Sequence, residues 1–210
     1  MDSLRKLEEL FAKFPGIGPR QARRFVYYLL NKSPSYIREF TQLVEEVRKM
    51  TVECTQCHRF FMRSNGSMAQ GVNSSGLCNV CSDPKRDRST LMIVARDSDF
   101  ETVERSGAYR GLYFILGGSV PVLDKEPEKR IRLRELLEHV DASSDIKEII
   151  LSLNTTPDGE HTATIVREAL GKLTRILPTL VSVLGRGLST GAELEYVDGE
   201  TIKNALKNRQ

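Results

Sequence analysis

Four cysteines, the only ones in this chain of 210 residues, are arranged in two pairs whose spacing is typical of a metal site. Cys54 and Cys57 form the first Cys-x-x-Cys pair, and Cys78 and Cys81 form the second after 20 intervening residues. Two such pairs can place four thiolates around one ion in the tetrahedral arrangement that Zn²⁺ accepts. Because a site closed by four thiolates leaves no open position for water or substrate, the predicted role of one Zn²⁺ per chain is structural.

Other uses of these cysteines agree less well with the sequence. Two disulfides would suit a secreted protein, but the N-terminus has the pattern of an amphipathic helix instead of a secretory signal. A redox Cys-x-x-Cys motif would not need two copies. An iron–sulfur cluster remains the minor alternative. His58 follows Cys57 and could replace a thiolate, but with four cysteines available we expect it to be an exposed neighbour.

A second candidate site is the stretch FPGIGPRQARRF, which runs from Phe14 to Phe25. Glycines permit a tight backbone and leave the first amide groups of a following helix uncovered, where the helix dipole favours an anion. Arginines at the rim of such a socket would supply charge to phosphates without reading bases. The residues concerned are Gly16, Gly18, Arg20, Arg23 and Arg24.

The charge of the chain is unevenly distributed. Residues 1–90 carry 15 Lys and Arg against 9 Asp and Glu, a balance of +6, whereas residues 91–210 carry 16 against 19, a balance of −3. Six basic residues and no acid lie between Ala12 and Arg38. A local positive field around the glycine-rich stretch favours a polyanionic partner.

Apolar spacing predicts the elements that must hold these residues in place. Helical periodicity predicts a small helical module with helices over residues 3–13, 20–30 and 35–50. Beyond residue 84, short apolar runs at 91–95, 112–116, 148–153 and 180–185 alternate with helical patterns near 99–106, 129–139 and 160–172. This alternation predicts the α/β class with a mainly parallel sheet. The tyrosines at 27, 28, 109 and 113 are interpreted as packing residues.

Taken in order, these features resemble the RecR family of bacterial recombination mediators over essentially the whole chain. The first block resembles a helix-hairpin-helix, a motif of many repair proteins that binds the DNA backbone. The cysteine pairs follow it, and the remaining blocks are IVARDSDFETVERSGAYRGLYFILGG, NTTPDGEHTATIVREAL and GRGLSTGAELEYVDGETIKNAL. The resemblance implies a helix-hairpin-helix module over 1–52, a Cys₄ zinc finger over 53–84, a Toprim domain over 85–178 and a C-terminal segment over 179–210 that completes the Toprim domain and makes oligomer contacts.

The same resemblance assigns roles to individual residues. It places Gly16, Gly18, Arg20, Arg23 and Arg24 in the DNA-binding hairpin and makes Cys54, Cys57, Cys78 and Cys81 the zinc ligands. It also implies an acidic Toprim patch that faces a protein partner or DNA. The residues of that patch are Asp99, Glu104, Asp158 and Glu160.

One departure from the catalytic Toprim pattern argues against an enzyme. Catalytic Toprim domains use a glutamate at the end of the first strand, together with later acids, to hold Mg²⁺ for phosphoryl chemistry. The corresponding residue is Ala95, whose methyl group can neither bind a metal nor move a proton. Asp97 is displaced by two residues and is expected at the wrong depth to replace it. The alternative interpretation is a catalytic Toprim nuclease or a topoisomerase-like phosphoryl transferase.

The resemblance also implies the setting in which the protein acts. We expect a non-catalytic DNA-binding clamp that acts in DNA repair and recombination. We expect it to be cytoplasmic and associated with the nucleoid, and not to bind a membrane. The expected partners are single- and double-stranded DNA without sequence preference, a RecO-type protein, in some cases a RecF-type protein, and further copies of the chain in a homodimer or homotetramer ring. Its expected role is to help load recombinase onto single-stranded DNA.

Overall fold

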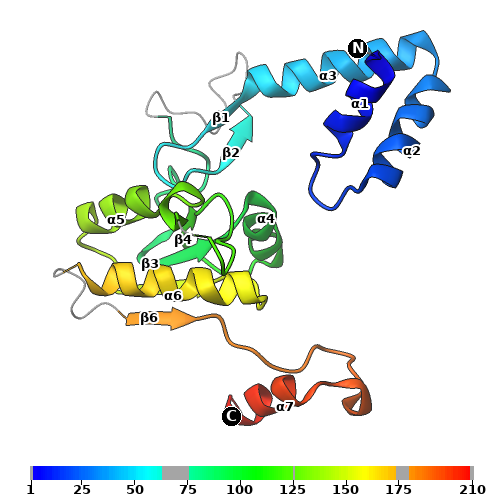
Figure 1. Cartoon of the computed structure of the whole chain (residues 1–210). Coiled ribbons are helices and arrows are strands. Elements are labelled where there is room, and N and C mark those ends of the chain that lie inside the picture. The colour runs from blue at the N-terminus through cyan, green and yellow to red at the C-terminus, as the bar shows by residue number, and fades with distance from the viewer. Residues whose placement is uncertain (1, 63–75, 125, 174–179, 209–210) are drawn as a thin grey trace. The chain divides into compact units, whose positions relative to one another are not determined.

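The computed structural model describes residues 2–62, 76–124, 126–173 and 180–208 (Figure 1). Most of the spacer between the cysteine pairs, and the junction expected near residue 178, lie outside these ranges. The chain divides into two compact units, Met1–Thr51 and Val52–Gln210.

The N-terminal unit consists of three helices, α1 (Ser3–Phe11), α2 (Pro19–Leu30) and α3 (Pro34–Met50). Side-chain oxygens cap two of them, since Asp2 accepts the N–H of Leu4 and Ser33 accepts the N–H of Tyr36. Helices α1 and α2 pack through the rings of Phe11 and Phe25, whose centroids are 5.7 Å apart. The three helices predicted from apolar spacing are therefore confirmed.

The second unit is built on a four-stranded parallel sheet with the order β4-β3-β5-β6. Its strands are β3 (Asp87–Val94), β4 (Gly111–Ile115), β5 (Glu148–Ser152) and β6 (Leu180–Val183). Three helices connect or cover them, namely α4 (Asp97–Ser106), α5 (Leu133–Ala142) and α6 (Pro157–Gly171). The chain continues through a short 3-10 helix, Leu194–Tyr196, to α7 (Gly199–Lys207). The α/β class and the parallel sheet agree with the prediction.

Helix α5 begins four residues later than its apolar pattern suggested. Residues Pro127–Lys129 form a 3-10 turn instead. The backbone N–H of Arg132 donates to the carbonyl of Leu116 at 2.8 Å, so the chain is fixed to the end of β4 before the helix starts.

The alternating side chains of the strands build two separate cores, one on each face of the sheet. On one face, Leu91, Ile93 and Phe114 pack against the buried side of α5 and α6. On the other face, Met92, Val94, Tyr113 and Ile115 pack against Phe100 of α4 and against the four cysteines. The cysteine module, with its small two-stranded sheet of β1 (Thr51–Glu53) and β2 (Phe60–Met62), therefore shares a core with the sheet.

The tyrosine prediction is correct for only half of its residues. Tyr113 is buried and Tyr109 packs against it at a centroid distance of 5.1 Å. By contrast, Tyr27 and Tyr28 are each 51% exposed. The buried side of α2 consists of Ala22 and Val26, and the two tyrosines lie outside it.

Candidate functional site

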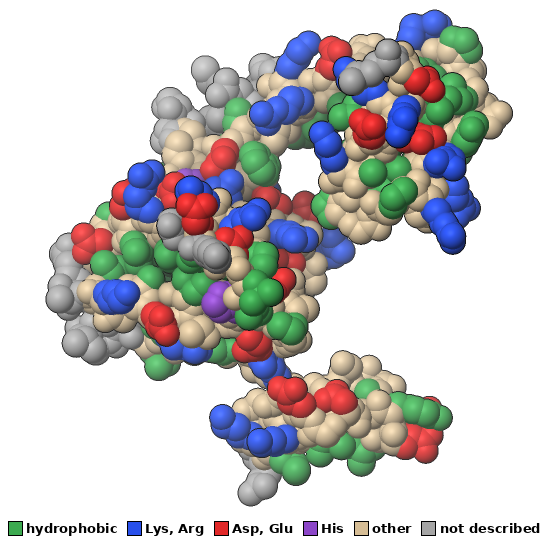
Figure 2. Space-filling view, in the orientation of Figure 1, with side chains coloured by type: hydrophobic (Ala, Val, Ile, Leu, Met, Phe, Trp, Pro, Cys, Tyr) green, Lys and Arg blue, Asp and Glu red, His purple; other side chains and the backbone are tan. Residues whose placement is uncertain are grey.

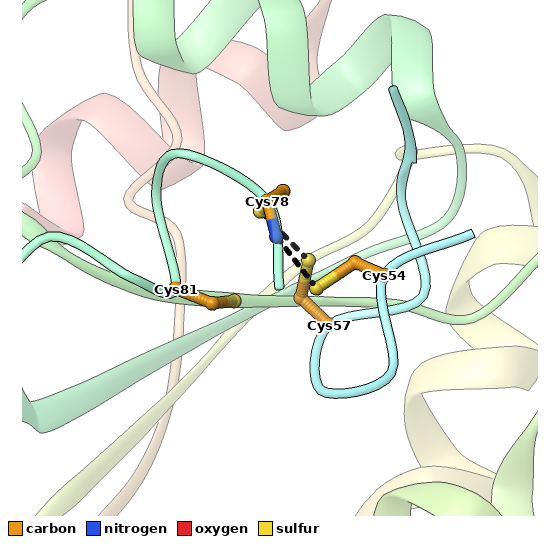
Figure 3. Close-up of side chains that lie close together, drawn as sticks. All are labelled: Cys54, Cys57, Cys78 and Cys81. Carbon is orange, nitrogen blue, oxygen red and sulfur yellow. Dashed lines mark hydrogen bonds between the residues drawn. The ribbon is translucent and has the colours of Figure 1, made fainter. Parts of the chain in front are cut away.

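The four cysteines converge from two loops onto one point (Figure 3). Each is at most 2% exposed. Their sulfur atoms all lie within 4.8 Å of one another, and the Sγ atoms of Cys57 and Cys78 are 3.7 Å apart. The N–H of Cys78 also donates to Sγ of Cys54 at 3.4 Å, which fixes the two loops together.

This donor set fits a tetrahedral metal ion. Zn–S bonds of about 2.3 Å at tetrahedral angles separate the sulfurs by about 3.8 Å, close to the Cys57–Cys78 distance. Within the described part of the chain, no other group of three or more His, Cys, Asp or Glu side chains could share an ion. The four thiolates would hold the ion and leave it no position for a substrate, so its contribution would be to tie the two loops together.

Crowding four thiols also perturbs their protonation. Hydrogen bonds from the thiol of Cys57, and then from those of Cys78 and Cys81, hold the pKa of Cys54 below its ordinary value. The same contacts, led by that with Cys54, raise the pKa of Cys81. Within the same set of thiol contacts the pKa of Cys78 is lowered as well and that of Cys57 is raised, so some thiolates are favoured while the full set is opposed, because like charges at this spacing repel. A bound cation removes that opposition.

His58 braces the cysteine module, and the expectation that it is an exposed neighbour is wrong. Its backbone is left-handed, with φ of 63°, and its side chain is only 19% exposed. Nδ1 lies 2.7 Å from the carboxylate of Glu53, and the ring packs edge-on against Phe114 at 5.1 Å. The turn that brings Cys57 inward directs His58 onto the edge of the sheet core.

The glycine-rich stretch forms the turn between α1 and α2, as its sequence predicts. Gly16 adopts a left-handed conformation with φ of 74°, which favours glycine. Gly18 is the N-cap of α2 and offers no side chain to the first-turn amides, while Pro19 starts the helix. A Cβ built on Gly18 would meet no atom within 4 Å, so the space beside this turn is open.

The three predicted arginines of α2 have different surroundings. Arg23 pairs with Glu8 of α1 at 3.3 Å, which engages it inside the unit. Arg24 donates only to its neighbour Gln21 at 3.2 Å, and Arg20 makes no ion pair with any described residue. All three are exposed, and Figure 2 shows basic side chains gathered over the start of α2. Arg20 and Arg24 are therefore the cations most available to an external anion.

Two of the predicted acidic residues are engaged within or beside α4. The Asp99 carboxylate accepts the N–H of Arg96 at 2.9 Å and so caps the helix. Glu104 accepts two hydrogen bonds from Arg86 and one from the Tyr113 hydroxyl, the last at 3.0 Å. Arg86 could not be found from the sequence, because it lies 18 positions from Glu104 and no local pattern joins them.

The other two acids lie in the first turn of α6. Asp158 accepts the N–H of Val122 at 3.2 Å and anchors the loop after β4. Glu160 pairs with Arg186, a second partner that sequence reasoning missed. The four acids thus come from two helices, and each has a partner within the chain.

The end of β3 carries a methyl group at Ala95, the position that corresponds to the glutamate of catalytic Toprim domains. Ala95 is fully buried, and its carbonyl accepts the N–H of Gly117 at 3.0 Å. Asp97 points its carboxylate at the N–H of Phe60, 2.8 Å away, and so joins α4 to the cysteine module. The Asp97 carboxylate, the candidate to replace the catalytic glutamate of Toprim enzymes, is therefore already engaged in a hydrogen bond within the chain.

Comparisons with known proteins agree with this architecture. Residues 89–185 match the family model of the Toprim domain, and residues 187–210 match that of the RecR C-terminal region. The recombination protein RecR of Chloroflexus aurantiacus is 34% identical over 205 residues, which cover 98% of this chain and 92% of that protein. The RecR proteins of Ruegeria pomeroyi and Lactobacillus acidophilus are 34% and 29% identical, and each alignment covers 97% of this chain and 94% of the relative.

None of the helices in the described ranges combines the length and apolar character needed to cross a membrane. The parallel sheet, the cysteine cluster and the full-length similarity all lead to the same assignment: this chain belongs to the RecR family.

Proposed function

We propose that this protein is a non-catalytic, DNA-binding mediator of recombination. The observation that carries the proposal is the open glycine turn at the start of α2, where Arg20 and Arg24 are exposed and free of acidic partners among the described residues. Cations beside uncapped helix amides suit phosphate groups and do not read bases. The names of the relatives, recombination proteins, agree with this role.

The absence of catalysis is part of the proposal. Support comes from Ala95, which is buried where Toprim enzymes have a glutamate, and from Asp97, whose carboxylate holds the N–H of Phe60. Asp99, Asp158 and Glu160 each have a partner in the chain. Among the described residues, they do not converge with a third acid or histidine on a point that could hold an ion. We propose that this acidic surface meets a protein partner or DNA and does not cleave it.

We further propose that the metal is one Zn²⁺ per chain and that it is structural. The four-sulfur donor set and the burial of the cysteines beneath the sheet support this. Its chemistry is confined to holding thiolates, because the set of four leaves no site for a reacting group.

Assembly into a homodimer or homotetramer ring is also proposed. Helix α3 exposes an apolar stripe along one side, and an unpaired stripe of this size favours a protein contact. The stripe consists of Tyr36, Phe40, Leu43, Val44 and Val47. The C-terminal segment exposes Leu194, Tyr196 and Leu206 in the same way. The proposed further partners are RecO-type and RecF-type proteins, and the proposed location is the nucleoid. We also propose four segments: the helix-hairpin-helix module over 1–52, the zinc finger over 53–84, the Toprim domain over 85–178 and the C-terminal segment over 179–210.

DNA binding at the hairpin can be tested by fluorescence anisotropy with labelled single- and double-stranded oligonucleotides over a series of salt concentrations. Changing both Arg20 and Arg24 to alanine should weaken binding to every sequence. It should also reduce the slope of log affinity against log salt by about 0.7 to 0.9 for each phosphate that the variant no longer neutralises. The matched control is Arg134→Ala on α5, whose side chain is 81% exposed and should not matter.

An unchanged salt slope in the double variant, with the fold preserved by circular dichroism, would return the hairpin to a purely structural role. Incubation of the wild-type protein with DNA and Mg²⁺ tests the second part of the proposal. Cleavage or relaxation of the DNA that follows the protein through purification would show an enzyme and overturn it.

A further inference from the structure

Tyr27 is half exposed on the outer side of α2, where a packing residue would not lie. The inner side of the helix is defined by Ala22 and Val26, both 1% exposed. At 100° per residue, Tyr27 lies about 140° around the helix from Ala22. The ring is therefore directed away from the core of the N-terminal unit.

The same outer side carries the two available arginines. Arg20 precedes Tyr27 by seven residues and Arg24 by three, so all three share one face of the helix. Along the axis they span about 10 Å. The arrangement places two cations and one aromatic ring in a single strip, with Arg20 nearest the open glycine turn.

The ring of Tyr27 differs from that of the neighbouring Tyr28 in having no cation placed over it among the described residues. Lys32 places its Nζ 4.2 Å from the centre of the Tyr28 ring. Within the described ranges, no aromatic or cationic group contacts the ring of Tyr27. Its carbonyl accepts the side-chain amide of Asn31 at 2.8 Å, which fixes the backbone at this turn. A rigid backbone carrying a free aromatic ring is suited to stacking.

We propose that Tyr27 stacks on an unpaired base of single-stranded DNA whose phosphates are held by Arg20 and Arg24. This inference rests on the proposed DNA-binding function and assigns it a preferred substrate. Bases in a duplex stack on each other and present no free face, whereas every base of a single strand does. The arginines serve both forms of DNA, and Tyr27 serves only the single strand, so the hairpin prefers single-stranded DNA.

The test compares a dT oligonucleotide with a duplex of equal length at one salt concentration. Tyr27→Ala should weaken binding to the single strand by about tenfold, the scale of one base–aromatic stack, and leave duplex binding unchanged. Tyr27→Phe should retain the wild-type affinity for both, and Tyr27→Leu should behave as alanine because it keeps apolar bulk without a ring.

A second readout uses the lack of tryptophan in the chain. Tyr27→Trp introduces a single indole, and stacking on bases should quench its fluorescence when dT is added. Phe60→Trp provides the matched control, since the Phe60 side chain is 47% exposed, close to that of Tyr27, but belongs to the cysteine module. Its emission should not change.

The outcomes separate this inference from the function on which it rests. If the wild-type protein binds neither DNA, the proposed function fails. If it binds both with a normal salt slope and Tyr27→Ala weakens both or neither, only the stacking role is overturned. A Tyr27→Ala protein that loses its oligomeric state by light scattering, with equal effects on both DNAs, would instead assign the ring to a contact between copies of the chain.

Discussion

Replacement of Glu104 by alanine should destabilise the second unit without affecting DNA binding. The carboxylate, on α4, accepts two hydrogen bonds from Arg86 and one from Tyr113, which belongs to the core between the sheet and α4. Burial by itself would raise the pKa of Glu104, but hydrogen bonds from Arg86 and Tyr113 outweigh it and lower the pKa below its ordinary value of 4.5. The ionised form is thus the one that the fold stabilises.

The expected magnitude follows from how far each partner is exposed. The Arg86 side chain is 12% exposed and that of Glu104 is 31%. Removing one partner from a fully buried pair costs about 3–5 kcal/mol, and partial solvent access reduces the expected loss here to about 2 kcal/mol. For a chain of this length that loss lowers the melting temperature by about 4–8 °C. Glu104→Gln keeps an acceptor for Tyr113 and should lose about half as much.

Urea unfolding of both variants, followed by circular dichroism, measures this loss. A double-mutant cycle with Arg86→Met should show that the two changes are not additive. The pH dependence has a defined sign. Because the folded pKa lies below 4.5, the stabilisation by Glu104 is fully present above that pH and disappears as the pH falls through the folded value. The alanine variant should lose this part of the acid sensitivity.

A loss below about 0.5 kcal/mol, the range of an exposed ion pair, would contradict the structural role assigned to Glu104. So would a variant of normal stability that no longer binds DNA or a partner, since the carboxylate would then face a ligand.

Three other perturbations have defined outcomes. Metal analysis should find about one ion per chain, and chelation should lower thermal stability and make the four cysteines reactive toward a thiol reagent; a metal-free preparation of undiminished stability would contradict this. Gly159→Ala should destabilise by about 1–3 kcal/mol because its Cβ would lie 2.0 Å from the carbonyl oxygen of Asn154, whereas Gly171→Ala at the other end of α6 meets no atom within 4 Å and should be neutral or stabilising by urea unfolding. Burial, followed by the charge of the nearby His58, lowers the pKa of His139 below 6.5. Between 6.5 and the pKa of the folded state, the unfolded chain therefore binds more protons than the folded chain, and stability should fall as the pH drops through this range. His139→Gln should abolish this pH dependence of the melting temperature.

Local patterns were sufficient to predict most elements of this fold. Runs such as residues 91–95 and 112–116 became strands buried on both faces, as expected for a parallel sheet. The cysteine spacing predicted a cluster of sulfurs, and the glycine turn predicted the hairpin between α1 and α2. In each case the signal lies within a few residues or in a strong chemical preference.

Features that depend on contacts between distant residues could not be predicted in this way. The pairing of Glu104 with Arg86, and the use of Asp97 to hold Phe60, join residues 18 and 37 positions apart. The exposure of Tyr27 was not predicted, because an aromatic residue beside apolar residues resembles a member of the buried set. Its angular position around the helix, however, places Tyr27 outside the buried side. A helical-wheel projection would have provided the missing signal.

The burial of the cysteines beneath β4 has a consequence for how the protein is made. The carbonyl of Cys57 accepts the N–H of Ile115 at 2.9 Å, so the loop that carries the first cysteine pair is bonded to one edge of the sheet. A newly synthesised chain that meets no metal would leave the part of this face that the cysteines cover exposed, with apolar side chains such as Ile115 open to other chains. Metal supply would then limit the yield of folded protein, and a shortage would appear first as aggregation and degradation of new chains, before any loss of stability in chains that are already folded.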